Sequence, residues 1–540
     1  MRTVVALAVL IGLGLWSPPA PTLVIVDARV FTGDVARPWA QAIAIRGARI
    51  TAVGTTDEIR RTRGPATRVI DGGGRLLVPG IDDAHVHVDG GPPATQLGGP
   101  PAIEHDPTLD EVLGRIHAAV AKAPAGGWIR GEIAAAVLDD PRATRETFDR
   151  ITDGHPLLLE SWTGHGLIAN TSALRVLKMA VDEPDPPGGW FDREADGRTL
   201  TGVAHEYADF EVARRLAMLP GEPEQVEAFK RYASEAASYG ITSAQSMMTS
   251  YPAAPTARLL AKADLPIRLR LIDFPMTAMS GWRPAAVRTA RTGPLLTLSG
   301  TKWILDGTPV EHGMFLREPY ADAPSTRGQL NFPETEISGF LRRARAAGVQ
   351  PMFHAVGDGA IAAVLDALEA TGGARWKPLR PRIEHGDMLR PEDFDRAKRM
   401  GVVIVQNPSH FMIAPIIQAR LGPDRARRTF QVRSILAAGL PFALGSDGPM
   451  NPFLNIMFAT IDATNPSQAL SVQQALVAYT AGAAFAEFAE HDKGRLVPGL
   501  LADMALLSQD IFTIPPAGLP RTKSVLTIVD GRVVHDSLKR

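Results

Sequence analysis

The sequence predicts an α/β fold class, a (β/α)8 TIM-like barrel with a small composite β-sandwich formed by the N- and C-terminal segments. The long middle of the chain alternates apolar, strand-like runs with helix-like stretches, which favours a parallel barrel. Both ends carry short β-branched runs divided by turns, which is typical of small sheets. Histidines and an aspartate end several apolar runs in the middle. Because barrel enzymes place catalytic groups where strands end, these residues are the first candidates for a functional site.

Residues 1–21 predict a signal peptide or an N-terminal anchor. The segment has a single Arg, an apolar run from Val4 to Trp16, and small and proline residues ending near Ala20. The apolar run is too short to span a bilayer comfortably and has the length of a signal-peptide core. We therefore expect an exported protein, periplasmic or extracellular. Cleavage stays open, because a Pro-Pro pair lies beside the only plausible cleavage site.

Residues 22–77 and 488–540 are predicted to form the two parts of one β-sandwich. The first part contains TLVIVDARVF, AIAIRGARITAVG and RVIDGGGRLLVPG, with period-2 alternation and glycines between the runs. The second part repeats this character in ADMALLSQD and SVLTIVDGRVVHD. Two β-rich ends around a long middle indicate one sandwich that both ends of the chain close.

Residues 78–487 are predicted to form the barrel, with an early insertion. Helix-like stretches include residues 224–240 and 362–373. The strand candidates begin with the opening run inside 78–90 and continue at 156–162, 241–247, 267–274, 301–307, 349–357, 380–387, 402–410 and 441–447. These are nine candidates for the eight strands of a barrel, so one early strand is expected to belong to the insertion.

An H-x-H pair ends the opening strand, which reads VPGIDDAHVHVDG. Residues i and i+2 of a strand point to one face and lie roughly 6 to 7 Å apart, so His85 and His87 can converge on one metal ion. An isolated pair of this kind also arises by chance. His354, His385 and Asp447, however, end three later strands. Because the carboxyl ends of barrel strands meet on one rim, these five ligands together predict a metal site.

The motifs around these residues resemble a known family. PGIDDAHVHV, HAVGDGAI, RIEHGDML and ALGSDGPM, in this order, resemble the amidohydrolase superfamily. HPLLLESWTGHGLIANTSAL, TKWILDGTPVEHGMFLREPY and KGRLVPGLLADMALL are similar to one branch of it, amidohydrolase family 3, which contains N-substituted formamide deformylase. The resemblance covers the chain from about Thr22 to its end. It implies the same barrel and composite sandwich that the pattern predicts.

The resemblance also implies a set of metal ligands on strands 1, 4, 5, 6 and 8: His85, His87, Lys302, His354, His385 and Asp447. In this set Lys302 reacts with carbon dioxide to form a carbamate that bridges two ions, which requires a lysine held neutral by desolvation. An unmodified Lys302 favours a single ion. We therefore expect one or two divalent metal ions as cofactors. Imidazole and oxygen ligands favour Zn²⁺.

This ligand set predicts a metal-dependent amidohydrolase. The expected reaction is hydrolysis of a C–N bond in an amide, N-acyl or N-formyl group of a small molecule by metal-activated hydroxide. Asp447 is the expected catalytic residue, a general base that takes the proton of the water and delivers it to the leaving nitrogen. Two alternatives stay open: a deaminase or hydrolase of another bond on the same site, and a non-catalytic metal- or ligand-binding barrel.

Three residues near the predicted strand ends are candidates for substrate binding. His165 and Asn170 lie in WTGHGLIANTSAL, and His312 lies in PVEHGMF. Two stretches depart from the family pattern: Gln245 and Ser246 stand where relatives tend to carry a His-Asp pair, and Asp82 stands where an apolar residue is commoner. The first departure bears on substrate contacts, and neither removes a predicted ligand.

The composition excludes several classes of partner. The chain of 540 residues is 45% hydrophobic and has a formal net charge of -1, which argues against nucleic acid or an anionic membrane surface. It has no cysteine, which excludes disulfides, cysteine nucleophiles and thiolate metal sites. We expect a small-molecule substrate and no membrane contact beyond a retained N-terminal anchor. Assembly into a homo-oligomer stays open.

Overall fold

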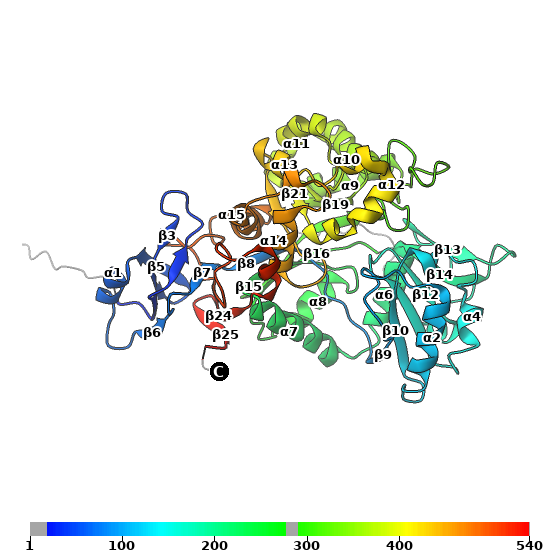
Figure 1. The fold of residues 1–540 in the computed structure, drawn as a ribbon, viewed down its shortest axis with the longest axis horizontal. Helices are drawn as coiled ribbons and strands as arrows, with labels where there is room; N and C mark the ends of the chain where they lie inside the picture. The colour runs from blue at the N-terminus through cyan, green and yellow to red at the C-terminus, as the bar shows by residue number, and fades with distance from the viewer. Residues whose placement is uncertain (1–18, 277–289, 539–540) are drawn as a thin grey trace, which may run out of the picture.

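The computed structural model describes residues 19–276 and 290–538 (Figure 1). The predicted signal peptide or anchor, residues 1–21, lies outside these ranges except for its last residues. Within the two ranges, no helix has the length and apolar character that crossing a bilayer requires. The described residues form a parallel barrel, an insertion with its own sheet, and a sandwich of two sheets.

Eight parallel strands form a nearly closed barrel, which confirms the predicted fold class. In order around the barrel they are β8 (Ile81–Val86), β15 (Ile241–Met247), β16 (Arg268–Asp273), β18 (Leu296–Ile304), β19 (Pro351–Ala355), β20 (Arg382–His385), β21 (Val403–Gln406) and β22 (Phe442–Leu444). β17 (Ala290–Gly293) pairs with β18 outside this ring. A bridge between Val86 and Asp447 closes the seam, and the Asp447 N–H donates to the His85 carbonyl at 2.8 Å. The seam thus places Asp447 beside the H-x-H pair.

Helices follow most of the barrel strands. They are α7 (Glu222–Ser238), α8 (Ala253–Leu260), α9 (Glu334–Ala347), α10 (Asp358–Thr371), α11 (Phe394–Met400), α12 (Ala414–Ala426), α13 (Val432–Ala437), α14 (Pro452–Ile461), α15 (Val472–Val477) and α16 (Ala483–Ala486). The helix-like stretches at 224–240 and 362–373 fall largely in α7 and α10. Buried apolar side chains such as Phe340 of α9 and Leu365 of α10 join the main core with residues of the barrel strands.

An insertion between β8 and β15 builds its own six-stranded sheet. In sheet order its strands are β13 (Gly189–Arg193), β14 (Leu200–Glu206), β12 (Gly166–Ala169), β11 (Leu157–Ser161), β10 (Trp128–Ile133) and β9 (Ala94–Gln96). Its helices are α2 (Leu109–Val120), α3 (Ala135–Leu138), α4 (Arg145–Asp149), α5 (Thr171–Val176) and α6 (Tyr207–Ala217). β11 lies within the strand candidate at 156–162, which is therefore the early strand outside the barrel. The insertion has its own apolar clusters and lies beside the barrel, in cyan in Figure 1.

Hydrogen bonds hold the insertion against the loops that follow the barrel strands. Glu311, in the loop after β18, accepts from Ser161 Oγ at 2.7 Å and from Thr163 Oγ1 at 2.5 Å. Asn331 Nδ2, also after β18, donates to Glu206 Oε2 at 2.8 Å. These contacts place the segment before β12 over the carboxyl end of the barrel.

Both ends of the chain build the sandwich, as predicted. One sheet contains β5 (Arg49–Gly54), β4 (Ala42–Arg46), β1 (Leu23–Val26) and β6 (Arg68–Asp71), with α1 (Thr56–Arg61) between β5 and β6 in the chain. The other contains β25 (Arg532–Asp536), β24 (Ser524–Val529), β23 (Met504–Leu507), β7 (Leu76–Pro79), β2 (Arg29–Phe31) and β3 (Trp39–Ala40). Gly80 joins β7 to β8, and a Cβ there would lie 2.1 Å from Thr242 Oγ1. Only glycine therefore fits where the sandwich leads into the strand of the H-x-H pair.

Candidate metal centre

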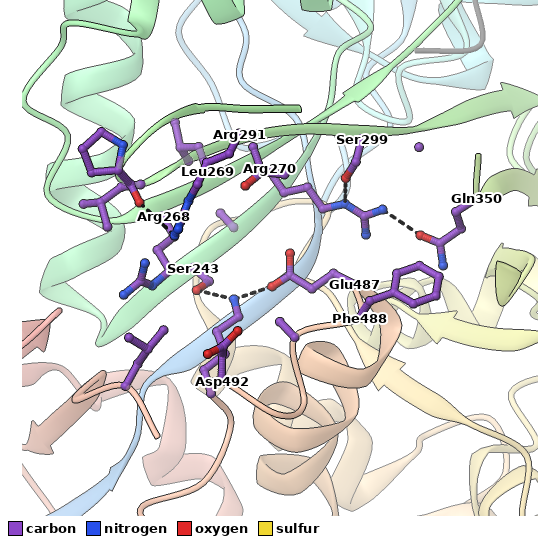
Figure 2. Close-up of a pocket in the computed structure, with 18 of the residues that line it drawn as sticks. Ser243, Arg268, Leu269, Arg270, Arg291, Ser299, Gln350, Glu487, Phe488 and Asp492 are labelled. Carbon is purple, nitrogen blue, oxygen red and sulfur yellow. Dashed lines mark hydrogen bonds and ion pairs between the residues drawn. The ribbon is translucent and has the colours of Figure 1, made fainter. Parts of the chain in front are cut away.

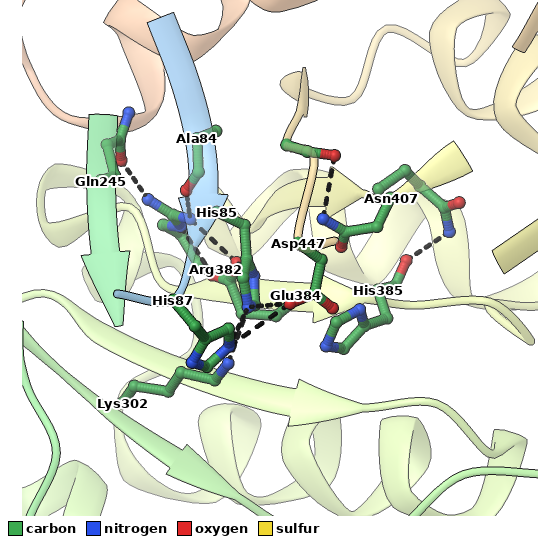
Figure 3. Close-up of polar contacts among 12 residues, drawn as sticks. Ala84, His85, His87, Gln245, Lys302, Arg382, Glu384, His385, Asn407 and Asp447 are labelled. Carbon is green, nitrogen blue, oxygen red and sulfur yellow. Dashed lines mark hydrogen bonds and ion pairs between the residues drawn. The ribbon is translucent and has the colours of Figure 1, made fainter. Parts of the chain in front are cut away.

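The structure brings the six predicted metal ligands to one end of the barrel. They lie on or directly after their strands: His85 and His87 at β8, Lys302 in β18, His354 in β19, His385 at the end of β20 and Asp447 after β22. Figure 3 labels five of them around a common space: His85, His87, Lys302, His385 and Asp447. They meet because parallel barrel strands all end on the same rim.

His85, His87 and Asp447 form a group that can hold a metal ion. The Nε2 atoms of the two histidines lie 3.3 Å apart. Asp447 Oδ1 lies 3.4 Å from His87 Nε2 and 3.8 Å from His85 Nε2. The His85 side chain is fully buried, whereas the side chains of His87 and Asp447 are 24% and 25% exposed. The group is therefore buried at His85 and partly exposed at His87 and Asp447.

A buried carboxylate fixes the tautomer of His85. His85 Nδ1 lies 2.7 Å from Glu384 Oε2, and Arg382 donates to the two Glu384 oxygens at 2.7 and 2.9 Å. Burial opposes ionisation of Glu384, but the Arg382 guanidinium and His85 outweigh burial and lower its pKa to about 2. Because an ionised carboxylate only accepts, His85 Nδ1 carries the proton. The lone pair of Nε2 then faces the group, which is typical of metal-binding histidines.

Arg382 is itself held by the barrel interior. It donates to Gln245 Oε1 at 2.6 Å and to the Ala84 carbonyl at 2.8 Å. Gln245, a departure from the family pattern, thus serves as an acceptor for Arg382. Sequence reasoning missed Arg382 and Glu384, although a signal was present. They are two charged residues at period 2 in the run RPRIEH, and this spacing places both on one face of a strand.

Two residues of the centre have backbones in the left-handed region. The φ angle is 68° at His385 and 57° at Asp447. This conformation costs a residue with a Cβ roughly 1–2 kcal/mol. Such residues persist where the surrounding structure holds them, and they cluster at functional sites. In Figure 3 both side chains point into the space shared with His85 and His87.

A second group that can hold a metal ion includes a residue that sequence reasoning missed. It consists of His385, His410 and Asp447. His410 lies in the 3-10 helix η3 (Pro408–Ile413), beyond β21, and its ring stacks on that of His385 with centroids 4.8 Å apart. Its Nδ1 lies 3.0 Å from Asp387 Oδ2, and its Nε2 lies 3.6 Å from Asp447 Oδ2. The available signal was the run 402–410, which ends in His410.

The imidazoles of the centre differ in charge. Burial lowers the pKa of four of them, which keeps them neutral and able to bind a metal: His85, His87, His354 and His385. Burial also acts to lower the pKa of His410, but Asp387 and Asp447 outweigh burial and raise this pKa to about 10. The surroundings of His410 therefore favour a positive charge.

Lys302 lies beside the first group. Its Nζ is 2.9 Å from His85 Nε2, and the residue is 1% exposed. Burial lowers the pKa of Lys302 to about 8. A lysine with a lowered pKa has a larger neutral fraction near neutral pH than an ordinary lysine, and the neutral amine is the nucleophilic form.

Two buried ring nitrogens of the centre have no hydrogen-bond partner within the described part of the chain: His354 Nε2 and His385 Nδ1. His354 Nε2 lies 3.8 Å from Asp306 Oδ1, and the rings of His354 and His385 have centroids 4.4 Å apart. A buried polar atom without a partner is unfavourable. Unpaired imidazole nitrogens beside a carboxylate therefore fit a divalent metal ion.

Among the residues predicted to bind substrate, His165 reaches the metal centre. Its ring centroid lies 4.7 Å from that of His354, and its Nδ1 lies 3.0 Å from Glu206 Oε2. His165 comes just before β12 of the insertion. The insertion thus contributes a buried imidazole to the space above the barrel.

The structure does not bring Asn170 and His312 beside the metal ligands. Asn170 caps α5, and its amide makes four hydrogen bonds inside the insertion, with Thr152, His155, Leu157 and Ala173. His312 Nε2 lies 3.2 Å from Asp322 Oδ1, in the loop after β18. Among the described residues, these contacts tie Asn170 to the insertion and His312 to that loop.

The amidohydrolase family profile matches residues 68–535. The chain belongs to the amidohydrolase family. This confirms the resemblance carried by the motifs. Protein LONG AFTER FAR-RED 3 of Arabidopsis thaliana is 29% identical, over 91% of this chain and 88% of its own. N-substituted formamide deformylase of Arthrobacter pascens is 26% identical, over 94% of this chain and 97% of its own.

A solved structure shares the fold of this amidohydrolase. It is an uncharacterized metal-dependent hydrolase from Pyrococcus horikoshii, with a TM-score of 0.71 and 21% identity over 92% of this chain and 99% of its own. In this amidohydrolase, the rim combines neutral imidazoles, an accessible carboxylate and a buried lysine. Such a site can bind a cation, hold a water next to a base, and place a substrate between the rim and the insertion.

Proposed function

We propose that this amidohydrolase hydrolyses a C–N bond in an amide, N-acyl or N-formyl group of a small molecule, and that it depends on one or two divalent metal ions. The observation that carries the proposal is the group of His85, His87 and Asp447, whose ligand atoms lie within 4.8 Å of one another. Zn²⁺ is the proposed ion, because the ligands are imidazole and oxygen.

Two ions are proposed to share the six predicted ligands. His85, His87 and Asp447 belong to the first, and His354, His385 and a carbamate on Lys302 to the second. When bound, such an ion lowers the pKa of a coordinated water and polarises a carbonyl oxygen. Glu384 keeps the Nε2 lone pair of His85 directed at the first ion. The lowered pKa of Lys302 supports the carbamate, since the neutral amine is the form that reacts.

Asp447 is the proposed general base. Burial opposes its ionisation, but His85 and the other imidazoles around it outweigh burial and hold its pKa well below the usual range. It is therefore an ionised carboxylate, and its side chain is 25% exposed. A carboxylate in this position can accept a proton from water and pass it to the leaving nitrogen.

The proposed substrate contacts lie on the insertion, where His165 approaches His354. His165 lies in the loop between β11 and β12, and loops held by a rigid scaffold commonly determine substrate specificity. The likeness to N-substituted formamide deformylase supports testing formamides first. N-acyl amino acids and cyclic amides complete the panel, because the same metal chemistry serves each of these carbonyl groups.

Incubation of the full chain with this panel, in the presence of Zn²⁺, tests the proposal. We expect one member of the panel to give a carboxylate and an amine in equal amounts, measured by mass spectrometry. Release of ammonia instead of an amine would indicate the deaminase alternative. The Asp447→Asn protein, purified in the same way, is the control for contaminating hydrolases. Products of equal yield with that variant would remove Asp447 as the base.

A further inference from the structure

We propose that the substrate of this amidohydrolase carries an ammonium group, and that Asp209 of α6 is the residue that determines this specificity. The inference rests on the proposed hydrolysis of an amide, and it adds the class of amide that the site takes. Three observations carry it: the position of α6, a set of carboxylates beside the metal centre, and the lack of a partner for Asp209 in the described part of the chain.

α6 is attached to the rim of the barrel at both of its ends. At its start, Tyr207 Oη accepts from the Ile304 N–H, at the end of β18, at 3.1 Å. Near its end, the Arg214 guanidinium donates to the Met248 carbonyl, just after β15, at 2.8 Å. Asp209 lies in the first turn of the helix. The helix thus places Asp209 at the same end of the barrel as the metal ligands.

Asp209 belongs to a set of carboxylates that we call the acidic cluster: Asp89, Glu160, Glu206, Asp209 and Glu311. Each of the others is close enough to Asp209 to raise its pKa. The cluster adjoins the metal centre at two points. Asp89 lies two residues beyond the metal ligand His87. Glu206 holds Nδ1 of His165 at 3.0 Å, and the centroid of the His165 ring lies 4.7 Å from that of His354.

The carboxylates of the cluster differ in their partners. Arg130 donates to both oxygens of Glu160, at 2.8 Å each, and so pairs this carboxylate with a cation. Glu311 accepts from the hydroxyls of Ser161 and Thr163, which satisfy its hydrogen bonds but carry no positive charge. The cluster therefore keeps negative charge that these bonded side chains do not neutralise.

Asp209 lacks a partner within the described ranges. Its side chain makes no hydrogen bond or ion pair there, although the residue is only 6% exposed. Burial and the charges of Glu160, Glu206, Glu311 and Asp89 all raise the pKa of Asp209 well above its usual range. A buried carboxyl without a partner is unfavourable. A cationic group at this place would donate to Asp209 and offset the charge of its neighbours.

The spacing of these carboxylates favours an organic cation over a metal ion. Among the described residues, the groups whose ligand atoms lie within 4.8 Å of one another are both at the metal centre, and neither contains a member of the acidic cluster. An ammonium group presents three donors and suits more widely spaced acceptors. Asp89 is exposed and the Glu160 side chain is 31% exposed, so the cluster is not sealed from solvent. An alkylammonium substituent on the substrate therefore suits this place.

The experiment compares paired amides that differ only in charge. The cationic member is an N-(ω-aminoalkyl)formamide or acetamide, and its partner is the N-alkyl amide in which a methyl group replaces the ammonium. The readout is the ratio of kcat/KM within each pair, for the full-length protein loaded with Zn²⁺, over a series of chain lengths. In the best pair we expect wild type to prefer the cationic member by about 10–100-fold, because the neutral member lacks a charged hydrogen bond.

Asp209→Asn keeps the shape of the side chain and removes its charge. We expect the preference for the cationic member to fall by about 10–100-fold in this variant. Asp182→Asn is the matched control, because Asp182 is also a carboxylate of the insertion but pairs with Arg198 and has a side chain that is 49% exposed. It should keep the wild-type ratio.

A wild-type ratio near unity would overturn the inference, leave the proposed hydrolysis standing, and require no variant to fold. An Asp209→Asn protein with the wild-type ratio would remove Asp209 as the residue that determines the specificity. If wild type hydrolyses neither member of any pair, the proposed function fails for these amides, and calorimetric titration of wild type with the same pairs tests the inference. Equal affinities for the two members would then overturn it, and tighter binding of the cationic member that Asp209→Asn loses would support it.

Discussion

The two ends of the barrel both bury charged and polar side chains, but they satisfy them differently. At the amino ends of the strands lies a set of residues that we call the base cluster: Asp82, Ser243, Arg270, Glu487 and Lys493. Lys493 pairs with Asp82 at 2.9 Å and with Glu487. At the opposite end, His354 Nε2 and His385 Nδ1 have no hydrogen-bond partner in the described part of the chain.

The base cluster is closed by contacts within the protein. Lys493 Nζ also donates to Ser243 Oγ at 2.5 Å. Arg270 donates to Ser299 Oγ at 2.8 Å and to Gln350 Oε1 at 2.7 Å. Figure 2 shows Arg270, Glu487 and Ser243 around a cavity of about 480 Å³ at this end of the barrel. Although a cavity is present there, the cations that line it already have anionic or polar partners.

The difference between the two ends separates structural from functional polar groups. Buried charges that form ion pairs within the chain maintain the fold, whereas buried imidazole nitrogens that converge without a hydrogen-bond partner can bind a ligand. Gln245 links the two ends, because its Nε2 donates to Asp82 Oδ1 at 3.3 Å while its Oε1 accepts from Arg382. We therefore expect substitutions at the metal centre to change metal binding and turnover, and substitutions in the base cluster to change stability.

The largest effect is expected at the metal centre. Asp447→Asn should lower kcat about 10²–10⁴-fold, because the amide cannot take the proton of the water. The measurement is initial rate on the substrate found in the panel. Asp366→Asn, an exposed carboxylate paired with Arg396 away from both metal groups, is the control and should keep its rate. Equal rates for wild type and Asp447→Asn would contradict the assignment of the base.

The second-largest effect is expected in the base cluster, on the stability of the fold. Lys493→Met should lower the free energy of unfolding by about 3–5 kcal/mol, because it leaves buried carboxylates without their cation. Urea unfolding followed by circular dichroism measures the loss. Lys230→Met removes a surface pair with Glu227 and should change stability by less than about 1 kcal/mol. The comparison between the two ends fails if Lys493→Met is as stable as Lys230→Met, or if it loses bound metal while folded.

A smaller effect is expected from the carboxylate behind His85. Glu384→Gln should weaken the first metal site about 10–100-fold, because the amide no longer determines which nitrogen of His85 carries the proton. Competition with a chromogenic chelator measures the affinity. Glu490→Gln, which breaks the pair with Arg380 outside the metal centre, is the control. Unchanged affinity in Glu384→Gln would show that the tautomer of His85 is held by other contacts.

The smallest effect is a pH dependence of the base cluster. Burial and the neighbouring Glu487 raise the pKa of Asp82 to about 7. A carboxyl whose pKa is raised in the folded state contributes stability at low pH, and this contribution is lost as pH rises through about 7. In Asp82→Asn this decrease should be absent. Unfolding free energies of both proteins at about pH 5 and about pH 8 test this, and an identical decrease in both would contradict it.

The parts of the site that the sequence predicted are those tied to strand ends. His85, His354 and His385 lie at the carboxyl ends of apolar runs, and in a barrel such ends meet whatever the loops do. This rule did not predict His410, because His410 lies beyond β21, in η3, and its position depends on the conformation of the segment that follows the strand. Lys493 likewise follows the last barrel helix, yet its side chain enters the barrel, a contact that no local pattern indicates.

The fold shows the same division between features that local sequence patterns predict and features that depend on distant contacts. Hydrophobic alternation and the count of strands predicted the barrel, the composite sandwich and an early strand outside the barrel. The six-stranded sheet of the insertion was not predicted, since its strands pair over long separations, as β12 does with β14. Asn170 shows the limit of motifs: it lies in a stretch that resembles the family, but its amide caps α5.

Metal content per chain tests the central claim most directly. Elemental analysis by mass spectrometry, after purification and dialysis, should find one or two divalent ions per chain in wild type and in folded Lys493→Met. The double variant His85→Ala and His87→Ala should lose the first ion and all turnover. A wild-type chain that hydrolyses its substrate without a divalent ion, or a double variant that keeps both ions, would contradict the account.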